Sequence, residues 1–250
     1  MDKLAEQGFC IVPDVLNEYE VRQTKAALLN AVTESERRGL PTYMPGLDPN
    51  EANVRVFNLI ELDKIFRELI LHKTALALVN GLLGEGFLIS NFTANIARPG
   101  SKSMSIHSDQ GIVIPEPWLQ PWAMNIIWCL DDVYAENGAT RYLPGSHKIE
   151  KASELPPEMR SQMKPFEAKA GSIIAMDGRM WHTSGDNVTD TSERALLFGY
   201  YTANFIRPQA NWNAVLSSET ISGLDEGLFD YLGLGPSANI RLTGTLVNQP

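Results

Sequence analysis

Apolar positions in the first third of the chain recur at helical spacing. Asn17, with Glu20 three positions later, forms a capping-box pattern, and the apolar periodicity that follows continues until Gly39. Asp63 stands where it would cap a second helix, and a third is expected over about 74–83. We therefore expect residues 1–85 to form a helical support.

From residue 86 the pattern changes to short apolar segments separated by Gly, Pro and Asn. Predicted strands cover residues 87–96, 104–109, 122–130, 140–143, 172–176 and 196–203, with an earlier short strand at 8–12. Helices followed by many short strands indicate a mainly β protein with flanking helices, an antiparallel barrel or jelly roll. We predict one domain over 1–250: the helical support, a core over 86–205, and a tail over 206–250 packed on the core.

Composition narrows the choice of partner and location. The chain has 44% hydrophobic and 20% charged residues, as an ordinary globular protein does, and its net charge of −9 argues against nucleic acid or an anionic membrane. No apolar run approaches the roughly 20 residues of a membrane helix, and the first residues lack a signal-peptide pattern. Cys10 and Cys129 lie in apolar runs and are expected to be free thiols. These features predict a cytoplasmic monomer or homodimer that acts on a small molecule.

The stretch 106–111 contains a histidine and a carboxylate that one residue separates. On a strand, His107 and Asp109 would share a face and could bind one metal, although such pairs also arise by chance. A second histidine would complete the 2-His-1-carboxylate set that suits non-haem Fe(II). We favour His182, because a Gly-Asp-Asn turn and a strand beginning with Arg194 follow it. The alternative, His147, follows a Pro-Gly turn and would otherwise bond its own turn's backbone.

Several motifs occur in a defined order along the chain. They are the His107–Asp109 pair, Leu130-Asp131-Asp132, the Glu-Asn-Gly to Pro-Gly-Ser-His-Lys segment at 136–148, and Trp181-His182-Thr183-Ser184-Gly185-Asp186-Asn187 with Arg194. Together they resemble the phytanoyl-CoA dioxygenase family of Fe(II)/2-oxoglutarate-dependent oxygenases, over about residues 8–212. The resemblance implies a double-stranded β-helix (jelly roll, cupin-like) with Fe(II) in its mouth. It also implies 2-oxoglutarate and O2 as cosubstrates, release of succinate and CO2, and oxidation of an unactivated C–H bond.

Three residues are candidates for binding 2-oxoglutarate. Arg194 opens an apolar strand, and a buried guanidinium favours a carboxylate; the resemblance assigns it the distal carboxylate of the cosubstrate, whereas a salt bridge with Glu193 or Asp190 is the alternative. Ser184 would point the same way and donate its hydroxyl, unless it is only a turn residue. Asn125, polar within an apolar strand, would contact 2-oxoglutarate or make a structural hydrogen bond.

The substrate is less constrained than the cosubstrate. The loop 110–122 has no Lys or Arg and is rich in apolar and aromatic residues, which favours a compact, largely apolar metabolite, such as a secondary metabolite, over an acyl-CoA. An acyl-CoA hydroxylase, a jelly-roll metal isomerase or hydrolase, and a binding module without chemistry remain alternatives. The charged, proline-broken segment 148–171 is either a lid or a connection.

Overall fold

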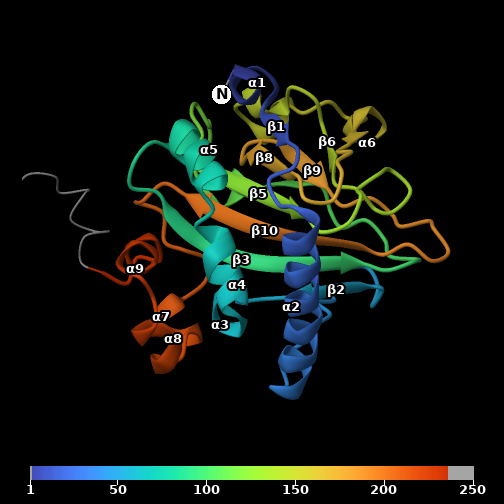
Figure 1. Ribbon diagram of the computed structural model, residues 1–250. Coiled ribbons are helices and arrows are strands. Elements are labelled where there is room, and N and C mark those ends of the chain that lie inside the picture. Colours follow the sequence, from blue (N-terminus) through green and yellow to red (C-terminus); the bar gives the residue numbers. More distant parts are fainter. Residues whose placement is uncertain (1, 236–250) are drawn as a thin grey trace, which may run out of the picture.

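The computed structural model describes residues 2–235, and its core consists of two antiparallel sheets (Figure 1). In order across the large sheet, the strands are β1 (Phe9–Val12), β8 (Ile173–Asp177), β5 (Ala123–Cys129), β10 (Arg194–Thr202), β3 (Leu88–Ala97) and β2 (Asn53–Val56). The small sheet has the order β4 (His107–Ser108), β9 (Trp181–Thr183), β6 (Arg141–Tyr142) and β7 (Lys164–Pro165). The mainly β jelly-roll prediction is confirmed.

Alternation along the central strands separates two cores. On β5, Trp128 packs on the helix side of the large sheet, whereas its neighbour Ile127 faces the space between the sheets. On β10, Leu197 and Leu196 divide in the same way. Because successive strand residues point to opposite faces, one sheet buries apolar side chains on both. Polar side chains on the inner face are therefore exceptions within an apolar interior.

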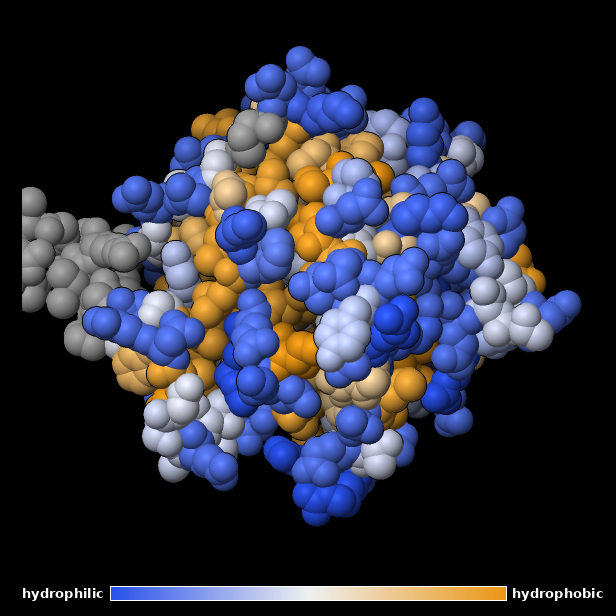
Figure 2. Space-filling view, in the orientation of Figure 1, coloured by the Kyte–Doolittle hydropathy of each residue, from blue (hydrophilic) through white to orange (hydrophobic). Residues whose placement is uncertain are grey.

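Helices cover the outer face of the large sheet (Figure 1). The three predicted helices are α2 (Glu18–Arg37), α4 (Lys64–Ile70) and α5 (Lys73–Leu83), accompanied by the shorter α1 (Asp2–Gln7) and α3 (Leu59–Leu62), whereas α6 (Met159–Gln162) lies beside the small sheet. The Asn17 side chain accepts from the backbone of Glu20, whose side chain accepts from Asn17 N–H, so the predicted capping box is confirmed. Figure 2 shows hydrophilic side chains over this helix-covered face, with hydrophobic residues between them.

Two predicted segments differ from the structure. Of residues 104–109, only His107 and Ser108 are in a strand, and Asp109–Ile112 form a 3-10 turn. Before the strand, the backbone of Met104 bonds side chains and not the backbone of a neighbouring strand. Thr183 Oγ1 donates to Met104 O (2.6 Å), and Ser184 Oγ accepts from Met104 N. The first 85 residues also supply the edge strands β1 and β2, so they are more than a helical support.

The tail after residue 205 is described as far as residue 235, and the rest of the predicted 206–250 segment lies outside the described residues. It forms the short helices α7 (Trp212–Val215), α8 (Ser218–Ser222) and α9 (Glu226–Tyr231). Trp212 Nε1 donates to Ile89 O (2.9 Å), and Leu228 is buried, so this part packs on the sheet. Among the described residues, no helix is long and apolar enough to cross a membrane.

Candidate metal centre

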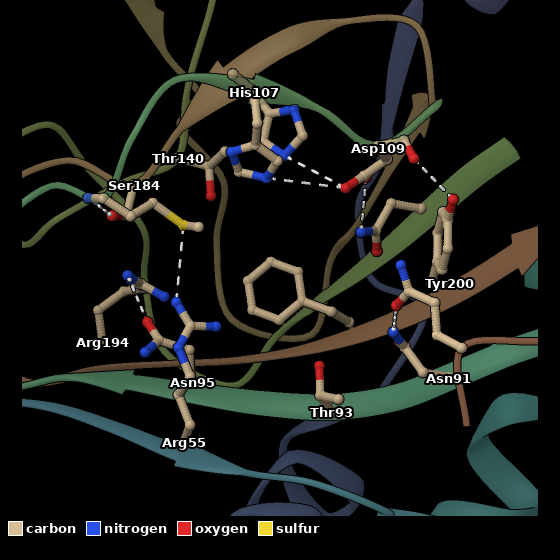
Figure 3. A pocket seen from close by; sticks show the side chains of 15 residues that line it. Arg55, Asn91, Thr93, Asn95, His107, Asp109, Thr140, Ser184, Arg194 and Tyr200 are labelled. Atoms are coloured by element: carbon tan, nitrogen blue, oxygen red, sulfur yellow. Dashed lines mark hydrogen bonds and ion pairs between the residues drawn. The ribbon is translucent and has the colours of Figure 1, made fainter. Parts of the chain in front are cut away.

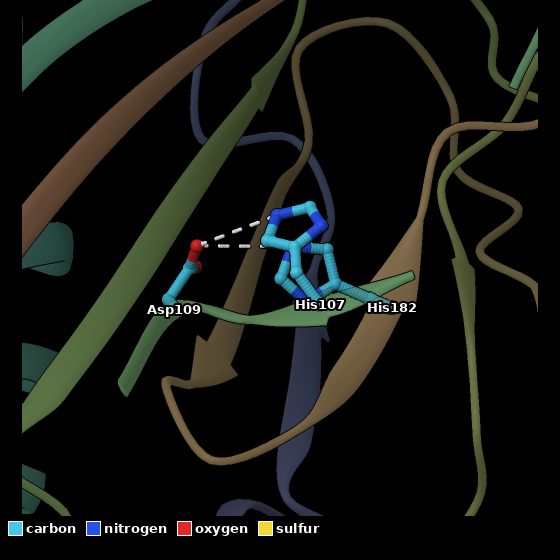
Figure 4. Close-up of side chains that lie close together, drawn as sticks. All are labelled: His107, Asp109 and His182. Atoms are coloured by element: carbon cyan, nitrogen blue, oxygen red, sulfur yellow. Dashed lines mark ion pairs between the residues drawn. The ribbon is translucent and has the colours of Figure 1, made fainter. Parts of the chain in front are cut away.

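Three side chains from the small sheet and the turn beside it converge on one point (Figure 4). His107 and His182 are cross-strand partners on β4 and β9, and their ring centroids lie 4.3 Å apart. Asp109 Oδ1 lies 3.9 Å from His107 Nε2 and 3.8 Å from His182 Nε2. One ligand atom from each residue therefore fits within a 4.8 Å cluster, which is the donor set of a 2-His-1-carboxylate site.

Both histidines are held in the tautomer that a metal requires. His107 Nδ1 lies 3.0 Å from Ser105 O, and His182 Nδ1 lies 3.0 Å from Met180 O. Because a carbonyl only accepts, each Nδ1 carries the hydrogen and each Nε2 keeps its lone pair for the centre. Burial lowers the pKa of His182, although the nearby Asp109 carboxylate offsets part of the shift, and this favours the neutral imidazole that a ligand must be.

Asp109 is positioned by bonds that leave one carboxylate oxygen for the centre. Ser108 is extended, so His107 and Asp109 share a side although the strand ends between them. Asn125 Nδ2 donates to Asp109 Oδ2 (3.0 Å), and the Tyr200 hydroxyl donates to the Asp109 carbonyl (2.8 Å). The remaining oxygen, Oδ1, is the one nearest both imidazoles.

A cavity of about 150 Å³ opens beside these residues, between the two sheets (Figure 3). Its lining is mostly polar, and three of its members alternate along β3. The lining residues are Arg55, Asn91, Thr93, Asn95, Met104, His107, Asp109, Asn125, Thr140, His182, Ser184, Arg194, Phe198, Tyr200 and Gln209. The alternation of Asn91, Thr93 and Asn95 within an apolar strand was a visible signal that the sequence analysis did not use.

Arg194 is a buried cation with unused donors. Its side chain donates from one Nη to Asn95 Oδ1 (3.2 Å), while Nε and the other Nη are buried without a hydrogen-bond partner in the described residues. Burial lowers its pKa to about 10, so it is charged at neutral pH. Neither predicted surface partner, Glu193 or Asp190, has a salt bridge with it among the described residues; Glu193 lies near Arg98 instead. An uncompensated buried guanidinium indicates an anionic ligand.

A second guanidinium, Arg55, lines the same end of the cavity (Figure 3). It makes a two-pronged bond with buried Asp48, at 2.6 and 2.8 Å, and its positive charge further lowers the pKa of Arg194. Arg55 was not predicted from the sequence, because β2 is only four residues long and no motif surrounds it. This end of the cavity is therefore electropositive, mainly through Arg194, because Arg55 is paired with Asp48.

The other predicted contacts also line the cavity. Ser184 Oγ accepts from Met104 N (3.0 Å) and therefore keeps its own hydrogen to donate. Asn125 is 6% exposed, and its Nδ2 donates a hydrogen bond to Asp109. Its Oδ1 is buried without a partner in the described residues. Thr140, at the start of the predicted strand 140–143, is a lining residue that the sequence analysis did not single out.

His147 lies outside the cluster. It is buried, and its Nε2 is 3.3 Å from Ala5 O in α1, so the expected bond to its own turn is wrong. None of the residues 110–122 or 148–171, all described, lines the cavity. Instead these two segments bond each other, Trp118 N to Glu150 O and Ala152 N to Glu116 Oε1.

Comparison with known proteins agrees with this architecture. The chain is 49% identical over 231 residues to dioxygenase af480 of Aspergillus fumigatus, which covers 92% of this chain and 75% of that protein. Dioxygenase cdmA of Talaromyces verruculosus is 24% identical over 82% of this chain and 72% of its own. In structure, the chain is similar to HygX of Streptomyces hygroscopicus with nickel and 2-oxoglutarate bound. The TM-score is 0.64 at 18% sequence identity, and the match covers 82% of this chain and 86% of HygX. It is also similar to the α-ketoglutarate-dependent carbocyclase SnoK from nogalamycin biosynthesis. Here the TM-score is 0.66 at 21% sequence identity, and the match covers 84% of this chain and 86% of SnoK.

A family profile decides the class. Residues 4–195, most of the chain, match the family described as phytanoyl-CoA dioxygenase (PhyH). The match spans the His107–Asp109 pair, His182 and Arg194, so it includes the whole metal cluster and the buried guanidinium. With the relative at 49% identity, this makes the protein a dioxygenase that belongs to the phytanoyl-CoA dioxygenase family.

Proposed function

We propose that the protein is an Fe(II)- and 2-oxoglutarate-dependent dioxygenase in which His107, Asp109 and His182 bind the iron. One observation carries this proposal: two imidazole Nε2 atoms and one carboxylate oxygen converge beside a cavity whose far end holds an unpaired guanidinium. When bound, Fe(II) and 2-oxoglutarate would supply the reduction of O2 and the oxidation of a substrate C–H bond, with release of succinate and CO2.

The electropositive end of the cavity fits the distal carboxylate of 2-oxoglutarate. Arg194 offers Nε and one Nη, and Ser184 offers its hydroxyl hydrogen. Asn95 adds Nδ2, a buried donor without a partner in the described residues. Arg55 raises the local potential while Asp48 holds it in place. These donors would orient the cosubstrate, and burial would strengthen each bond.

Asp109 favours hydroxylation, or another halide-free oxidation, over halogenation. The halogenating relatives of this family lack the carboxylate ligand, and here Asp109 is held in place through Asn125 and Tyr200. The carboxylate would occupy the position that a halide needs.

For the substrate we propose a free small metabolite and not an acyl-CoA. The only arginines or lysines lining the described cavity are Arg55 and Arg194. Arg194 is buried and Arg55 is paired with Asp48, so neither is free at the surface to bind the phosphates of coenzyme A. The cavity, about 150 Å³, is below the roughly 300 Å³ typical of a drug-sized site, so the cosubstrate would fill much of it. The substrate would bind toward the mouth, where His107 is 36% exposed.

A succinate-release assay tests the proposal. The purified protein, loaded anaerobically with Fe(II), is given 2-oxoglutarate and air with a library of small metabolites, and succinate is measured. We expect succinate formation to require Fe(II), O2 and 2-oxoglutarate together, and Zn(II)-loaded protein to form none. If 2-oxoglutarate shows no calorimetric binding to the metal-loaded protein, the proposal fails; turnover with Zn(II) alone would favour a hydrolase or isomerase.

A further inference from the structure

We infer that the substrate of this site carries a hydroxyl or N–H group whose hydrogen bond Asn125 Oδ1 accepts. The inference rests on the proposed function and adds a chemical requirement on the substrate. It starts from the orientation of two buried asparagine side chains, which their charged neighbours fix.

Asn125 lines the cavity and has a buried acceptor without a partner in the described residues. Its Nδ2 must be the atom near Asp109 Oδ2, at 3.0 Å, because a metal-binding carboxylate only accepts hydrogen bonds. That assignment turns Oδ1 away from Asp109, and Oδ1 is buried without a partner in the described residues. A buried acceptor without a donor is costly, so a bound molecule that supplies one is favoured.

Asn95 is oriented the other way. Its Oδ1 faces a guanidinium nitrogen of Arg194 at 3.2 Å, and a guanidinium only donates. Its Nδ2 is therefore the atom without a partner in the described residues. The end of the cavity near Arg194 thus offers donors, whereas Asn125 offers an acceptor beside Asp109.

2-Oxoglutarate can satisfy only one of these ends. At neutral pH it has two carboxylates and a ketone, all of which accept and none of which donates, so it fits Arg194 and Asn95 and cannot satisfy Asn125 Oδ1. The strand register separates the two asparagines: Asn125 is paired with Tyr200 on β10, and Asn95 with Leu196, four residues nearer to Arg194. The donor for Asn125 must therefore come from another molecule, either the substrate or a resident water.

The neighbours of Asn125 favour the substrate. Tyr200 donates its hydroxyl hydrogen to Asp109 O, so its oxygen presents lone pairs beside Asn125 in the same cavity wall. Two acceptors thus lie next to the carboxylate that holds the metal. This assigns Asn125 to the substrate, in place of the contact with 2-oxoglutarate expected from the sequence.

Matched fragment pairs test the inference without turnover. The protein is loaded with redox-inert Zn(II) and saturating 2-oxoglutarate, and dissociation constants are measured by NMR titration. The probes are cyclohexanol against methoxycyclohexane, and 2-piperidone against N-methyl-2-piperidone. We expect each donor to bind at least about fivefold more tightly than its methylated partner. In Asn125→Ala the two members should bind equally, while Asn95→Ala should keep the preference and weaken 2-oxoglutarate binding instead.

The outcomes separate the possible failures. A preference that persists in Asn125→Ala is steric and overturns the inference, as does equal binding or no binding of the donors to the wild type. A resident water would satisfy Oδ1 and donate onward to an ether, so ethers would bind as well as alcohols. The inference is also overturned if, at saturating metal, Asn125→Ala loses as much affinity for 2-oxoglutarate as Asn95→Ala does. Failure of 2-oxoglutarate to bind the wild type would instead refute the proposed function.

Discussion

His107 and His182 stand directly opposite each other across the β4–β9 pair, so the register of two short strands sets the geometry of the metal centre. A slip of one residue would turn one imidazole to the other face of the sheet. The hydrogen bonds from Trp181 N to Ser146 Oγ and from Leu143 N to Trp181 O fix β9 against the turn beside it. The register is thus held from outside the cluster.

Replacing His182 should abolish metal binding, whereas replacing His147 should not. In His182→Ala the centre loses a direct ligand, and we expect affinity for Fe(II) to fall by more than the roughly 10–100-fold that loss of an outer partner costs. His147→Ala is the matched control, because this buried histidine bonds Ala5 O and lies outside the cluster. Anaerobic Fe(II) titration measures both; full affinity in His182→Ala would rule out the assignment.

Arg194→Leu should weaken the binding of 2-oxoglutarate while the metal site survives. Stranding the cosubstrate's carboxylate without its buried partner costs about 3–5 kcal/mol, or more than a hundredfold in affinity. The control is Arg98→Leu, because Arg98 is half exposed and lies 3.5 Å from Glu193 at the surface. Calorimetry with 2-oxoglutarate on Zn(II)-loaded protein gives the affinities. Equal effects of the two substitutions would place the carboxylate elsewhere.

Gly8→Ala should destabilise the fold more than Gly39→Ala. Both glycines have positive φ, 80° and 71°, so both substitutions carry the backbone cost. A Cβ at Gly8 would lie 2.6 Å from the His147 ring, whereas a Cβ at Gly39 would meet no atom of residues 2–235 within 4 Å. We expect the difference in unfolding free energy to be about 1–3 kcal/mol, measured by urea denaturation. Equal losses would mean that the His147 ring moves aside freely.

The thiol of Cys129 should resist alkylation until the protein unfolds. Burial raises its pKa to about 12, so it is protonated at pH 8, and the thiolate is the reactive form. Cys10 is only half-buried and should react first, although burial raises its pKa as well. Mass spectrometry after iodoacetamide treatment, with Cys10→Ser as the single-thiol control, measures this. Rapid labelling of Cys129 in folded Cys10→Ser would contradict it.

Local patterns predicted the parts of the fold that local patterns determine. The capping box at Asn17 and the apolar segments that became β3, β5, β8 and β10 depend on neighbours in sequence, and their ends agree with the prediction to within two residues. The strand expected over 104–109 did not form in full, because distant side chains of Thr183 and Ser184 bond Met104. The local alternation of polar and apolar residues does not reveal such long-range bonds.

Within the site, the ordered motifs located the cluster, but long-range pairing determined its other residues. Arg55 reaches the cavity because β2 pairs with β3, and the four-residue β2 carries too weak a pattern to be recognised. Likewise, Asn125 was identified as an unusual polar residue, yet its bond to Asp109 depends on where the turn after β4 meets β5. A single sequence does not contain these distances.

The two walls of the cavity differ greatly in how many strand pairs hold them. β4 meets β9 through two residue pairs, whereas β10 meets β3 through nine and is braced by helices behind. Local opening costs less where few backbone bonds must break. The wall that carries the histidines can therefore open locally while the wall that carries Arg194 stays closed. Ligands would gain access through fluctuation of the small sheet, without disturbing the larger hydrophobic core between the large sheet and the helices.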